Sequence, residues 1–351
     1  MKGKGLENKD FHQEEAEQIA IAFTDYLNSF HKKGIQTDDK VLVQLYKDYV
    51  EMIPNVPKPN FNGVYNFRSS STGACAREHY SRLKHMKADP KGDILPQTTR
   101  WQNLGTRIGD MVQFDLLLAE KHHTGTFKFE RVQKEIPDFQ NNLWVRNFPH
   151  FEEFSTTTKF FDHNGKHFCI HGSTDGIMVY TKSDGTIVRV GLEIKSKQTS
   201  YSKTTYHTMK SADTKHKKQT ISYSLMFDVD YWVILYVNAS KKAWNPTQED
   251  LDKCPDIRAF GHYVTPKMKE EVLDRFAYIC ECVDTNTPPP LELNNWCFNN
   301  YKQSCAKTLT DAEMLALLDY AESEEVHAMP SWLQASVEAA VVEVAELRGT
   351  A

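Results

Sequence analysis

Two short, chemically distinctive segments dominate the middle of the chain. They read His171-Gly-Ser-Thr-Asp175-Gly and Gly191-Leu-Glu193-Ile-Lys195. The first lies in a strand-like run, Phe168 to Tyr180, and the second ends another, Ile187 to Lys195. Between the two runs, Lys182-Ser-Asp-Gly185 has the composition of a tight turn, so we predict a β-hairpin.

The hairpin predicts where its charged side chains point. Residues two apart on a strand share a face, so Glu193 and Lys195 face one side while Leu192 and Ile194 enter the core. The turn brings Asp175 close to Glu193. Two carboxylates suit a hard cation such as Mg²⁺, and a nearby ammonium can hold a water or counter a phosphate. This combination is suited to metal-assisted hydrolysis of a phosphodiester. Asp and Glu-x-Lys alone are also common on ordinary surface hairpins.

The segments that follow the hairpin extend the pattern. Residues 215–227 read as a helix, on which Gln219 and Tyr223 are neighbours on one face. Tyr231 to Asn238 is a short, continuously apolar run, as expected of a buried central strand.

Helical patterns surround this centre, so we predict an α/β fold with helical additions at both ends. The expected helices are 11–31, 39–53, 101–121, 266–284, 311–325 and 331–347, with a further helix starting near Gly73 after a Ser/Thr cap and a strand at 260–264. Composition breaks divide the chain into an N-terminal helical region (1–100), a core (101–285), and a cysteine-containing segment with C-terminal helices (286–351).

Composition narrows the class of protein. The chain has 351 residues and a net charge of −5, which gives no global argument for nucleic-acid binding. The longest apolar run, Tyr231 to Val237, is far shorter than a membrane span, and Met1 to Asp10 lacks the apolar core of a signal peptide. Seven cysteines at this length favour a reducing cytoplasm over a disulfide scaffold.

The order and spacing of these motifs resemble the PD-(D/E)XK nuclease superfamily. The motifs are Gly172-x-x-Asp175, Glu193-x-Lys195, Gln219-x-x-x-Tyr223 and then the apolar strand. The last pair is similar to the RecB-like exonuclease branch, which includes CRISPR-associated adaptation nucleases and many phage exonucleases.

The resemblance implies a restriction-endonuclease-like core with a central mixed β-sheet flanked by helices. It implies Mg²⁺ or Mn²⁺ held by Asp175, Glu193 and the main-chain carbonyl of Ile194. Lys195 would position the attacking water, and Gln219 and Tyr223 would contact DNA near the scissile phosphate.

One departure from the family lies on the helix 101–121. Members often carry the motif Gly-Thr-x-x-His, whose histidine faces the metal. This chain has Gly105-Thr-Arg-Ile-Gly109, so a glycine stands in place of the histidine. Asp110 and Gln113 are neighbours on that helix that could supply a ligand instead, or could simply face solvent.

A second departure concerns an iron–sulfur cluster that some members hold with one early and three late cysteines. Cys75, Cys297 and Cys305 stand in the matching order, but Asn300 occupies the place of the middle late cysteine. Three thiolates are one fewer than such a cluster normally requires, although Cys280 or Cys282 could supply a fourth. We therefore expect a chain without a cluster, its cysteines acting as buried apolar side chains.

The segment between the second strand and the Gln219 helix is basic. Its lysines and aromatic residues include Lys197, Lys203, Lys210, Lys217, Lys218, Tyr201 and Tyr206, and Asp213 is its one acidic residue. Lysines can neutralise phosphates and rings can stack on bases, so we predict that this segment borders a DNA path.

Together these features predict a metal-dependent DNA nuclease, with an exonuclease favoured, acting in DNA recombination, repair or phage replication. The compartment would be the cytoplasm of a bacterial or phage-infected cell, and a recombination or single-strand-binding protein is a conceivable partner. The alternatives are a structure- or site-specific endonuclease on the same fold and a catalytically silent DNA- or partner-binding module.

Overall fold

The computed structural model describes residues 4–34, 36–56, 58–61, 63–137, 142–293 and 296–349. The chain forms two compact units, each assembled from three stretches of sequence. Unit 1 comprises 1–60, 94–159 and 171–269, and unit 2 comprises 61–93, 160–170 and 270–351. The boundaries expected from composition, near residues 100 and 285, do not coincide with these, because each unit is interleaved along the chain.

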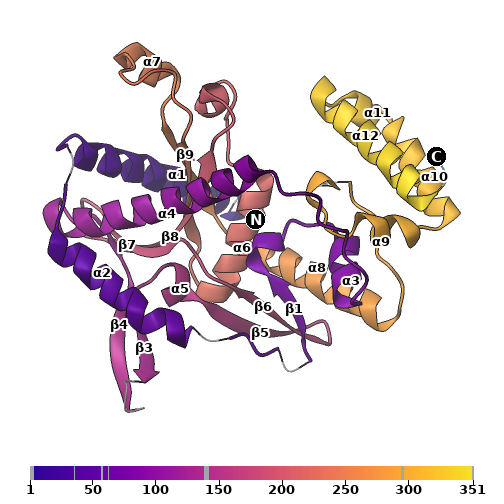
Figure 1. Cartoon of the computed structure of the whole chain (residues 1–351), viewed down its shortest axis with the longest axis horizontal. Helices are drawn as coiled ribbons and strands as arrows, with labels where there is room; N and C mark the ends of the chain where they lie inside the picture. Colours follow the sequence, from indigo (N-terminus) through magenta and orange to yellow (C-terminus); the bar gives the residue numbers. More distant parts are fainter. Residues whose placement is uncertain are drawn as a thin grey trace. The chain divides into compact units, whose positions relative to one another are not determined.

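Unit 1 contains a five-stranded mixed sheet in the order β10-β9-β8-β7-β2 (Figure 1). The strands are β2 (Phe127–Phe129), β7 (Gly176–Thr181), β8 (Ile187–Lys197), β9 (Tyr231–Asn238) and β10 (Ile257–Tyr263). Strands β7 and β8 are antiparallel, β8 and β9 parallel, and β9 and β10 antiparallel. A separate hairpin pairs β3 (Arg131–Pro137) with β4 (Leu143–Pro149).

Helices cover both faces of this sheet. The helices of the unit are α1 (Lys4–His31), α2 (Asp39–Met52), α4 (Pro96–His122), α5 (Glu152–Ser155), α6 (Thr214–Phe227) and α7 (Gln248–Lys253). Val233, Leu235 and Val237 of β9 enter the main core with α1 and α4. The alternate residues face α6, where Trp232 Nε1 donates to Ser224 Oγ and His216 bonds to the Tyr236 hydroxyl. The chain thus has a mixed α/β fold with a central mixed sheet flanked by helices, as expected.

Two glycines let the layers approach closely. A Cβ at Gly191 of β8 would lie 2.3 Å from the Trp232 ring, and one at Gly261 of β10 would lie 2.1 Å from the α1 backbone at Ala16. Neither position has room for any side chain. Helix α1 therefore lies directly on β10 and belongs to the core, rather than adding to its outside.

The expected hairpin is confirmed, whereas the expected single strand from Phe168 to Tyr180 is wrong. The Lys182 N–H donates a hydrogen bond to the Thr186 carbonyl oxygen across the turn, at 2.9 Å, and Gly185 within the turn has a φ of 85°. The run before the turn divides at residues 173–175 into β6 (Lys166–Gly172) and β7. Strand β6 pairs instead in a three-stranded sheet, β1-β6-β5, with β1 (Tyr65–Arg68) and β5 (Thr157–His163). The break matters because Asp175 lies in it.

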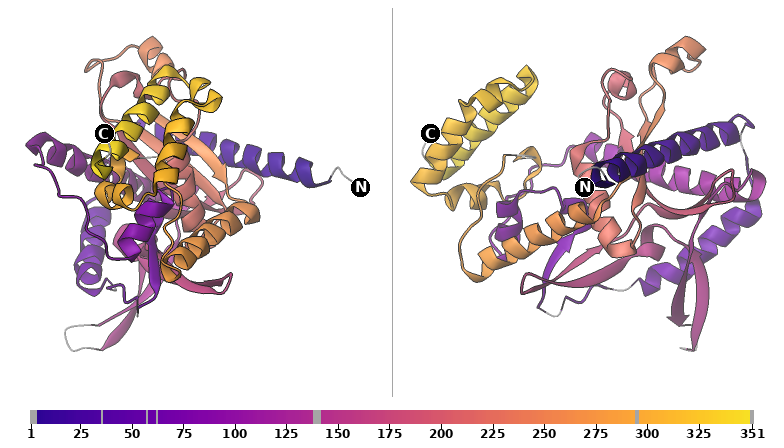
Figure 2. Two further views of the ribbon diagram at one scale, coloured as in Figure 1. Left: turned by 90° about the vertical axis from the view of Figure 1, so that its right-hand side faces the viewer. Right: turned by 180° about the vertical axis from the view of Figure 1, so that it is seen from behind.

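Unit 2 is mostly helical. It contains α3 (Ala76–Leu83), the greater part of α8 (Pro266–Asp284), α9 (Lys302–Lys307), α10 (Asp311–Ala321), α11 (Glu324–His327) and α12 (Ser331–Arg348). Helix α3 starts three residues later than expected, after a short 3-10 turn at Ser69–Ser71. Helices α10 and α12 lie side by side (Figure 2) and share an apolar core through Met314, Val341 and Val344. In the described part of the chain, no helix is both long and apolar enough to cross a membrane.

Candidate active site

Asp175 and Glu193 lie opposite one another at the end of the β7–β8 hairpin. Gly176 pairs with Leu192, so the register places Asp175 across from Glu193. The Asp175 carboxylate accepts a hydrogen bond from the Ile194 main-chain N–H, and Thr174 Oγ1 lies 3.3 Å from the Leu192 carbonyl oxygen. Two hydrogen bonds therefore connect the break before β7 to β8, at the residues on either side of Glu193.

Glu193 and Lys195 share the α6-facing side of β8, as the alternation predicts. Glu193 is 1% exposed, and its carboxylate forms an ion pair with the Lys195 ammonium. Leu192 and Ile194 are buried on the opposite side. The Glu193 Oε2 atom is buried without a hydrogen-bond partner among the described residues. A buried, unpartnered carboxylate oxygen is costly unless something binds it.

The electrostatics of the site raise the pKa values of both carboxylates. Burial, and then the Asp175 carboxylate, raise the pKa of Glu193 to about 8 against the pull of Lys195. Burial also raises the pKa of Asp175, opposed by Lys195 and the Ile194 N–H. Burial lowers the pKa of Lys195, but Glu193 and Asp175 more than offset it, so the pKa is raised overall. More negative charge is gathered here than one lysine neutralises, which is the condition a divalent cation relieves.

Helix α6 contributes Gln219 and Tyr223 to the same side of the sheet. Gln219 Nε2 donates to the Tyr223 hydroxyl at 2.7 Å, and both side chains are buried. The Tyr223 ring stacks on Trp232 of β9, with ring centroids 5.5 Å apart. Burial, and then the charge of Glu193, hold the pKa of Tyr223 well above its usual value. The hydroxyl thus stays protonated beside the acidic pair and remains a donor.

The two polar residues expected on α4 behave differently. Asp110 forms an ion pair with Arg107 on its own helix, with 2.6 Å between Oδ2 of Asp110 and Nη1 of Arg107. Gln113 is 1% exposed and reaches the site, where its Nε2 donates to the Asp175 main-chain carbonyl at 2.9 Å. The same amide donates to Glu152 Oε1 at 3.2 Å.

Glu152 is an acidic residue of this site that the sequence did not single out. Burial, and then Asp175, raise the pKa of Glu152 to about 7. It lies between the β3–β4 hairpin and β5, in a region where no motif marked it. The nearest sequence signal is the pair Glu152-Glu153 beside Phe151 and Phe154, which reads only as a charged turn between apolar residues.

The basic segment, residues 195–218, runs from β8 to α6 within unit 1. Lys197 and Lys203 line a cavity of about 310 Å³ with Thr208, Asp213 and Tyr236. The Lys197 ammonium lies 4.9 Å from the centre of the Tyr236 ring, and burial and neighbouring lysines lower the pKa of Lys197. In the described structure, Lys197, Lys203, Lys210, Lys217 and Lys218 form no ion pair with an acidic side chain.

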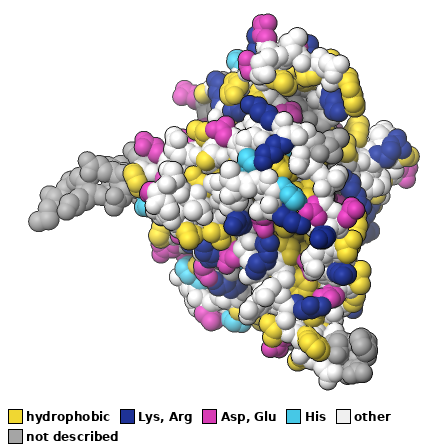
Figure 3. Space-filling model, turned by 90° about the vertical axis from the view of Figure 1, so that its left-hand side faces the viewer, with side chains coloured by type: hydrophobic (Ala, Val, Ile, Leu, Met, Phe, Trp, Pro, Cys, Tyr) yellow, Lys and Arg dark blue, Asp and Glu magenta, His cyan; other side chains and the backbone are white. Residues whose placement is uncertain are grey.

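The two tyrosines of this segment have separate surroundings. The Tyr201 hydroxyl donates to the Asp250 carbonyl, which anchors the segment to α7. Tyr206 is 61% exposed and packs against the Arg258 guanidinium at 4.2 Å. Of these two tyrosines, Tyr206 is therefore the one whose ring is accessible to solvent. Charge elsewhere is mixed: on the face drawn in Figure 3, Lys and Arg side chains are interspersed with Asp and Glu.

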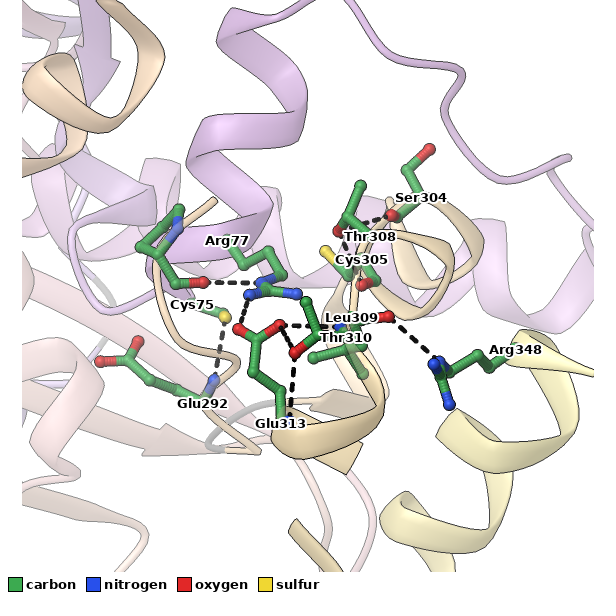
Figure 4. A network of polar contacts seen from close by, with 11 residues as sticks. Cys75, Arg77, Glu292, Ser304, Cys305, Thr308, Leu309, Thr310, Glu313 and Arg348 are labelled. Atoms are coloured by element: carbon green, nitrogen blue, oxygen red, sulfur yellow. Dashed lines mark hydrogen bonds and ion pairs between the residues drawn. The ribbon is translucent and has the colours of Figure 1, made fainter. Parts of the chain in front are cut away.

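Cys75 and Cys305 lie in one region of unit 2, and each thiol accepts a hydrogen bond within the protein (Figure 4). Cys75 Sγ accepts from the Glu292 N–H, and Cys305 Sγ accepts from Asn299 Nδ2. Burial raises the pKa of Cys75, and burial raises the pKa of Cys305 to about 11, so both thiols stay protonated. Cys297 is exposed. This donor set does not fit an iron–sulfur cluster, which needs thiolates converging on one point.

The residues of the acidic pair do fit a magnesium ion. Among the described residues, no three His, Cys, Asp or Glu side chains are gathered as a ready-made metal site. Mg²⁺ does not require such a set, because it keeps several waters and is commonly held by one or two carboxylates together with substrate phosphates. The unpartnered Glu193 oxygen opposite Asp175 supplies that kind of donor.

Removing the Glu193 charge should stabilise the metal-free protein at alkaline pH. With a pKa of about 8 in the folded state against an ordinary value of 4.5, Glu193 keeps its proton in the folded state after the unfolded chain has lost it. Its contribution to stability is therefore lost as pH rises from about 4.5 to about 8. The unfolding free energy of Glu193→Gln minus that of wild type should be near zero at the acid end and grow across this window.

Denaturant titrations with a chelator present would measure that difference. Taking the difference is necessary because buried histidines such as His150 and His262, whose pKa values burial lowers to about 4, destabilise the fold at acid pH. A difference that stays constant with pH would contradict the prediction. Adding Ca²⁺ should reverse the order of stability of the two proteins at alkaline pH.

Comparisons with known proteins provide little beyond this geometry. No family model and no curated protein sequence matches the chain. Among solved structures, SSO0001 matches with a TM-score of 0.36 at 12% identity, covering 77% of this chain and 98% of its own. An alkaline exonuclease from Laribacter hongkongensis matches with a TM-score of 0.34 at 9% identity, covering 64% of this chain and 91% of its own. Neither likeness, at these TM-scores and identities, assigns a function to the chain.

Proposed function

We propose that the chain is a metal-dependent DNA nuclease of the PD-(D/E)XK type, with Mg²⁺ or Mn²⁺ as its cofactor. The observation that carries the proposal is the register of the β7–β8 hairpin, which sets Asp175 opposite Glu193 with Lys195 paired to the latter. A bound divalent ion would activate water and stabilise the charge that develops on the leaving oxygen.

The chain's own residues have distinct parts in this proposal. Asp175, Glu193 and the Ile194 carbonyl hold the ion. Lys195 holds the attacking water, since its raised pKa keeps it a cation able to stabilise a nucleophile of hydroxide character. Gln219 and the protonated Tyr223 hydroxyl donate toward the phosphate.

An exonuclease of the RecB-like branch, acting in recombination, repair or phage replication, is the finer proposal. Incubation of the protein with linear and covalently closed circular DNA, with Mg²⁺ and with a chelator, tests it. Digestion of linear DNA alone supports an exonuclease, and cutting of circles supports an endonuclease on the same fold. No cleavage with Mg²⁺ or Mn²⁺ would leave a DNA- or partner-binding module.

The basic segment should supply phosphate contacts. Each phosphate that a lysine neutralises releases condensed counterions, so the slope of log affinity against log salt should fall by roughly 0.7–0.9 per contacting lysine removed. The triple variant of Lys203, Lys210 and Lys217 to alanine should weaken binding on all sequences alike, because phosphate contacts carry no base information.

Binding would be measured in Ca²⁺, which should occupy the site with little turnover. The matched control is Lys241→Ala together with Lys253→Ala, in the loop after β9 and in α7, which should leave the slope unchanged. An unchanged slope in the triple variant would show that the segment is an ordinary solvated face.

We also propose that the protein carries no iron–sulfur cluster. Cys75 and Cys305 are engaged as protonated, hydrogen-bonded thiols, and Asn300 offers no thiolate. Protein purified without air should be colourless and hold less than a stoichiometric amount of iron. A brown protein absorbing near ~400 nm would contradict this and make Cys75, Cys297 and Cys305 ligands.

A further inference from the structure

Glu152 is held in a backbone conformation that its residue type rarely adopts. Its φ is 46°, in the left-handed region, where a non-glycine residue persists only if its surroundings impose it. The Glu152 N–H donates to the Thr174 carbonyl at 2.9 Å, and the Glu152 carbonyl accepts from Ser155 Oγ at 2.9 Å. Ser155 Oγ in turn accepts from the Thr174 N–H at 3.0 Å. One direct hydrogen bond and a bridge of two through Ser155 therefore connect Glu152 to Thr174, the residue immediately before Asp175.

Gln113 joins the same two acidic residues from α4. One amide nitrogen donates both to Glu152 Oε1, at 3.2 Å, and to the Asp175 carbonyl, at 2.9 Å. Gln113 is 1% exposed, and its Oε1 is buried without a hydrogen-bond partner among the described residues. The Gln113 amide and the Glu193 carboxylate thus each have a buried oxygen without a hydrogen-bond partner among the described residues, which indicates a site for a ligand that brings donors. The water shell of a hydrated cation supplies such donors.

Gly109 leaves open the place on α4 that points at Glu152. A Cβ at Gly109 would lie 4.0 Å from Glu152 Oε1, so a longer side chain there would be directed at that carboxylate. With glycine at 109, the carboxylate arrives from α5 instead of from α4. Asp110, the adjacent helical acid, does not fill this place because it pairs with Arg107.

Glu152 also faces a route from solvent. It lines a cavity of about 570 Å³ together with Tyr49, Thr106, Asp110, Gln113 and Glu153. Asp110, Glu152 and Glu153 outnumber Arg107, the cation that lines the same cavity, so its charge favours the entry of a cation over that of an anion.

Resting on the nuclease function proposed above, we propose that Glu152 is the third carboxylate of the metal site. It binds the hydrated divalent ion together with Asp175 and Glu193, from the first residue of α5 and across the space that Gly109 leaves open on α4. The described residues hold no group of three acidic, histidine or cysteine side chains converged on one point. Binding through the water shell requires no such convergence, because the carboxylates then contact the waters and not the ion.

Metal affinity, measured without DNA, tests the assignment. Glu152→Gln keeps an oxygen for Gln113 to donate to and removes a buried charge, so the variant should fold, as thermal unfolding with a chelator would check. Calorimetric titration with Mn²⁺ should show an affinity about 10- to 100-fold below wild type, the range found when groups that orient metal ligands are removed. Glu153→Gln, the next residue and a wall of the same cavity, is the matched control and should bind Mn²⁺ like wild type.

A rescue experiment tests the link to position 109. In Glu152→Ala the space facing Gly109 is vacated, so adding Gly109→His should restore part of the lost Mn²⁺ affinity. In the wild-type background Gly109→His should weaken Mn²⁺ binding, because the imidazole competes with Glu152 for the same space. Equal effects in both backgrounds would refute the exchange between the two positions.

The outcomes separate this inference from the nuclease proposal. If Glu193→Gln loses Mn²⁺ binding while Glu152→Gln retains wild-type affinity, Glu152 is not part of the metal site and the nuclease proposal stands. If the wild-type protein binds no Mn²⁺, both fail.

Discussion

Asp175→Asn and Glu193→Gln should each reduce DNA cleavage on the order of 1,000-fold or more while leaving the protein folded. Both replacements are isosteric and keep the hairpin register, but each removes a negative ligand charge. Losing the ion removes the activated water together with several kcal/mol of transition-state charge stabilisation, and each ~1.4 kcal/mol is a factor of ten in rate. Single-turnover cleavage of linear DNA in Mg²⁺ at saturating protein would measure the loss.

The same hairpin offers a matched control. Asp184 lies at its turn end, is exposed, and accepts a hydrogen bond from the Thr186 N–H through Oδ1. Asp184→Asn retains that oxygen and lies far from the acidic pair, so cleavage should be unchanged. Near-wild-type cleavage by the Asp175 or Glu193 variant would remove the hairpin from the chemistry.

Arg77→Ala should destabilise unit 2 by about 2–5 kcal/mol, because it empties the space of a large, fully buried side chain and removes its buried hydrogen bond. Arg77 is fully buried, its Nε donates to the Pro289 carbonyl at 2.6 Å, and it pairs with Glu313 (Figure 4). Glu313 also closes the capping box of α10 with Thr310. The arginine thus connects α3 to the start of α10. Hydrogen exchange of α3 and α10 would report the loss locally.

Two further variants separate charge from packing. Arg348→Ala breaks an ion pair whose partner, Asp311, is 92% exposed, so it should cost no more than about 1 kcal/mol. Arg77→Met keeps much of the buried volume and should recover a large part of the stability, because Glu313 is partly exposed and can be solvated alone. If Arg77→Ala were no more destabilising than Arg348→Ala, the buried pair would not hold the unit together.

Local rules of the chain were enough to predict the hairpin and the faces on which its side chains lie. The period-two alternation of Leu192, Glu193, Ile194 and Lys195 allows only one assignment of faces, and the turn at Lys182–Gly185 sets the strands antiparallel. The continuous apolar run of β9 can only be buried, so its central place in the sheet followed as well. Helix α8 runs over Pro266–Asp284, as its pattern predicts.

Long-range packing decided what local pattern could not show. The run from Phe168 to Tyr180 looks like one strand, because β-propensity does not record which sheet a residue joins. Its division at 173–175 is stabilised by two hydrogen bonds that Thr174 donates. One runs from its N–H to Ser155 Oγ and the other from its Oγ1 to the Leu192 carbonyl oxygen. The place of α1 on β10 was equally hidden, since a single glycine, Gly261, admits the helix.

The acidic site divides in the same way. Asp175, Glu193 and Lys195 could be identified from sequence because one hairpin carries all three, and hairpin register depends on near neighbours. Glu152 could not, because its proximity depends on Thr174 and Gln113, which lie 22 and 39 positions away along the chain. Contacts over such separations are set by how elements pack, and no local spacing encodes them. The sequence alone thus determined the acidic hairpin, and only the tertiary structure brought Glu152 to it.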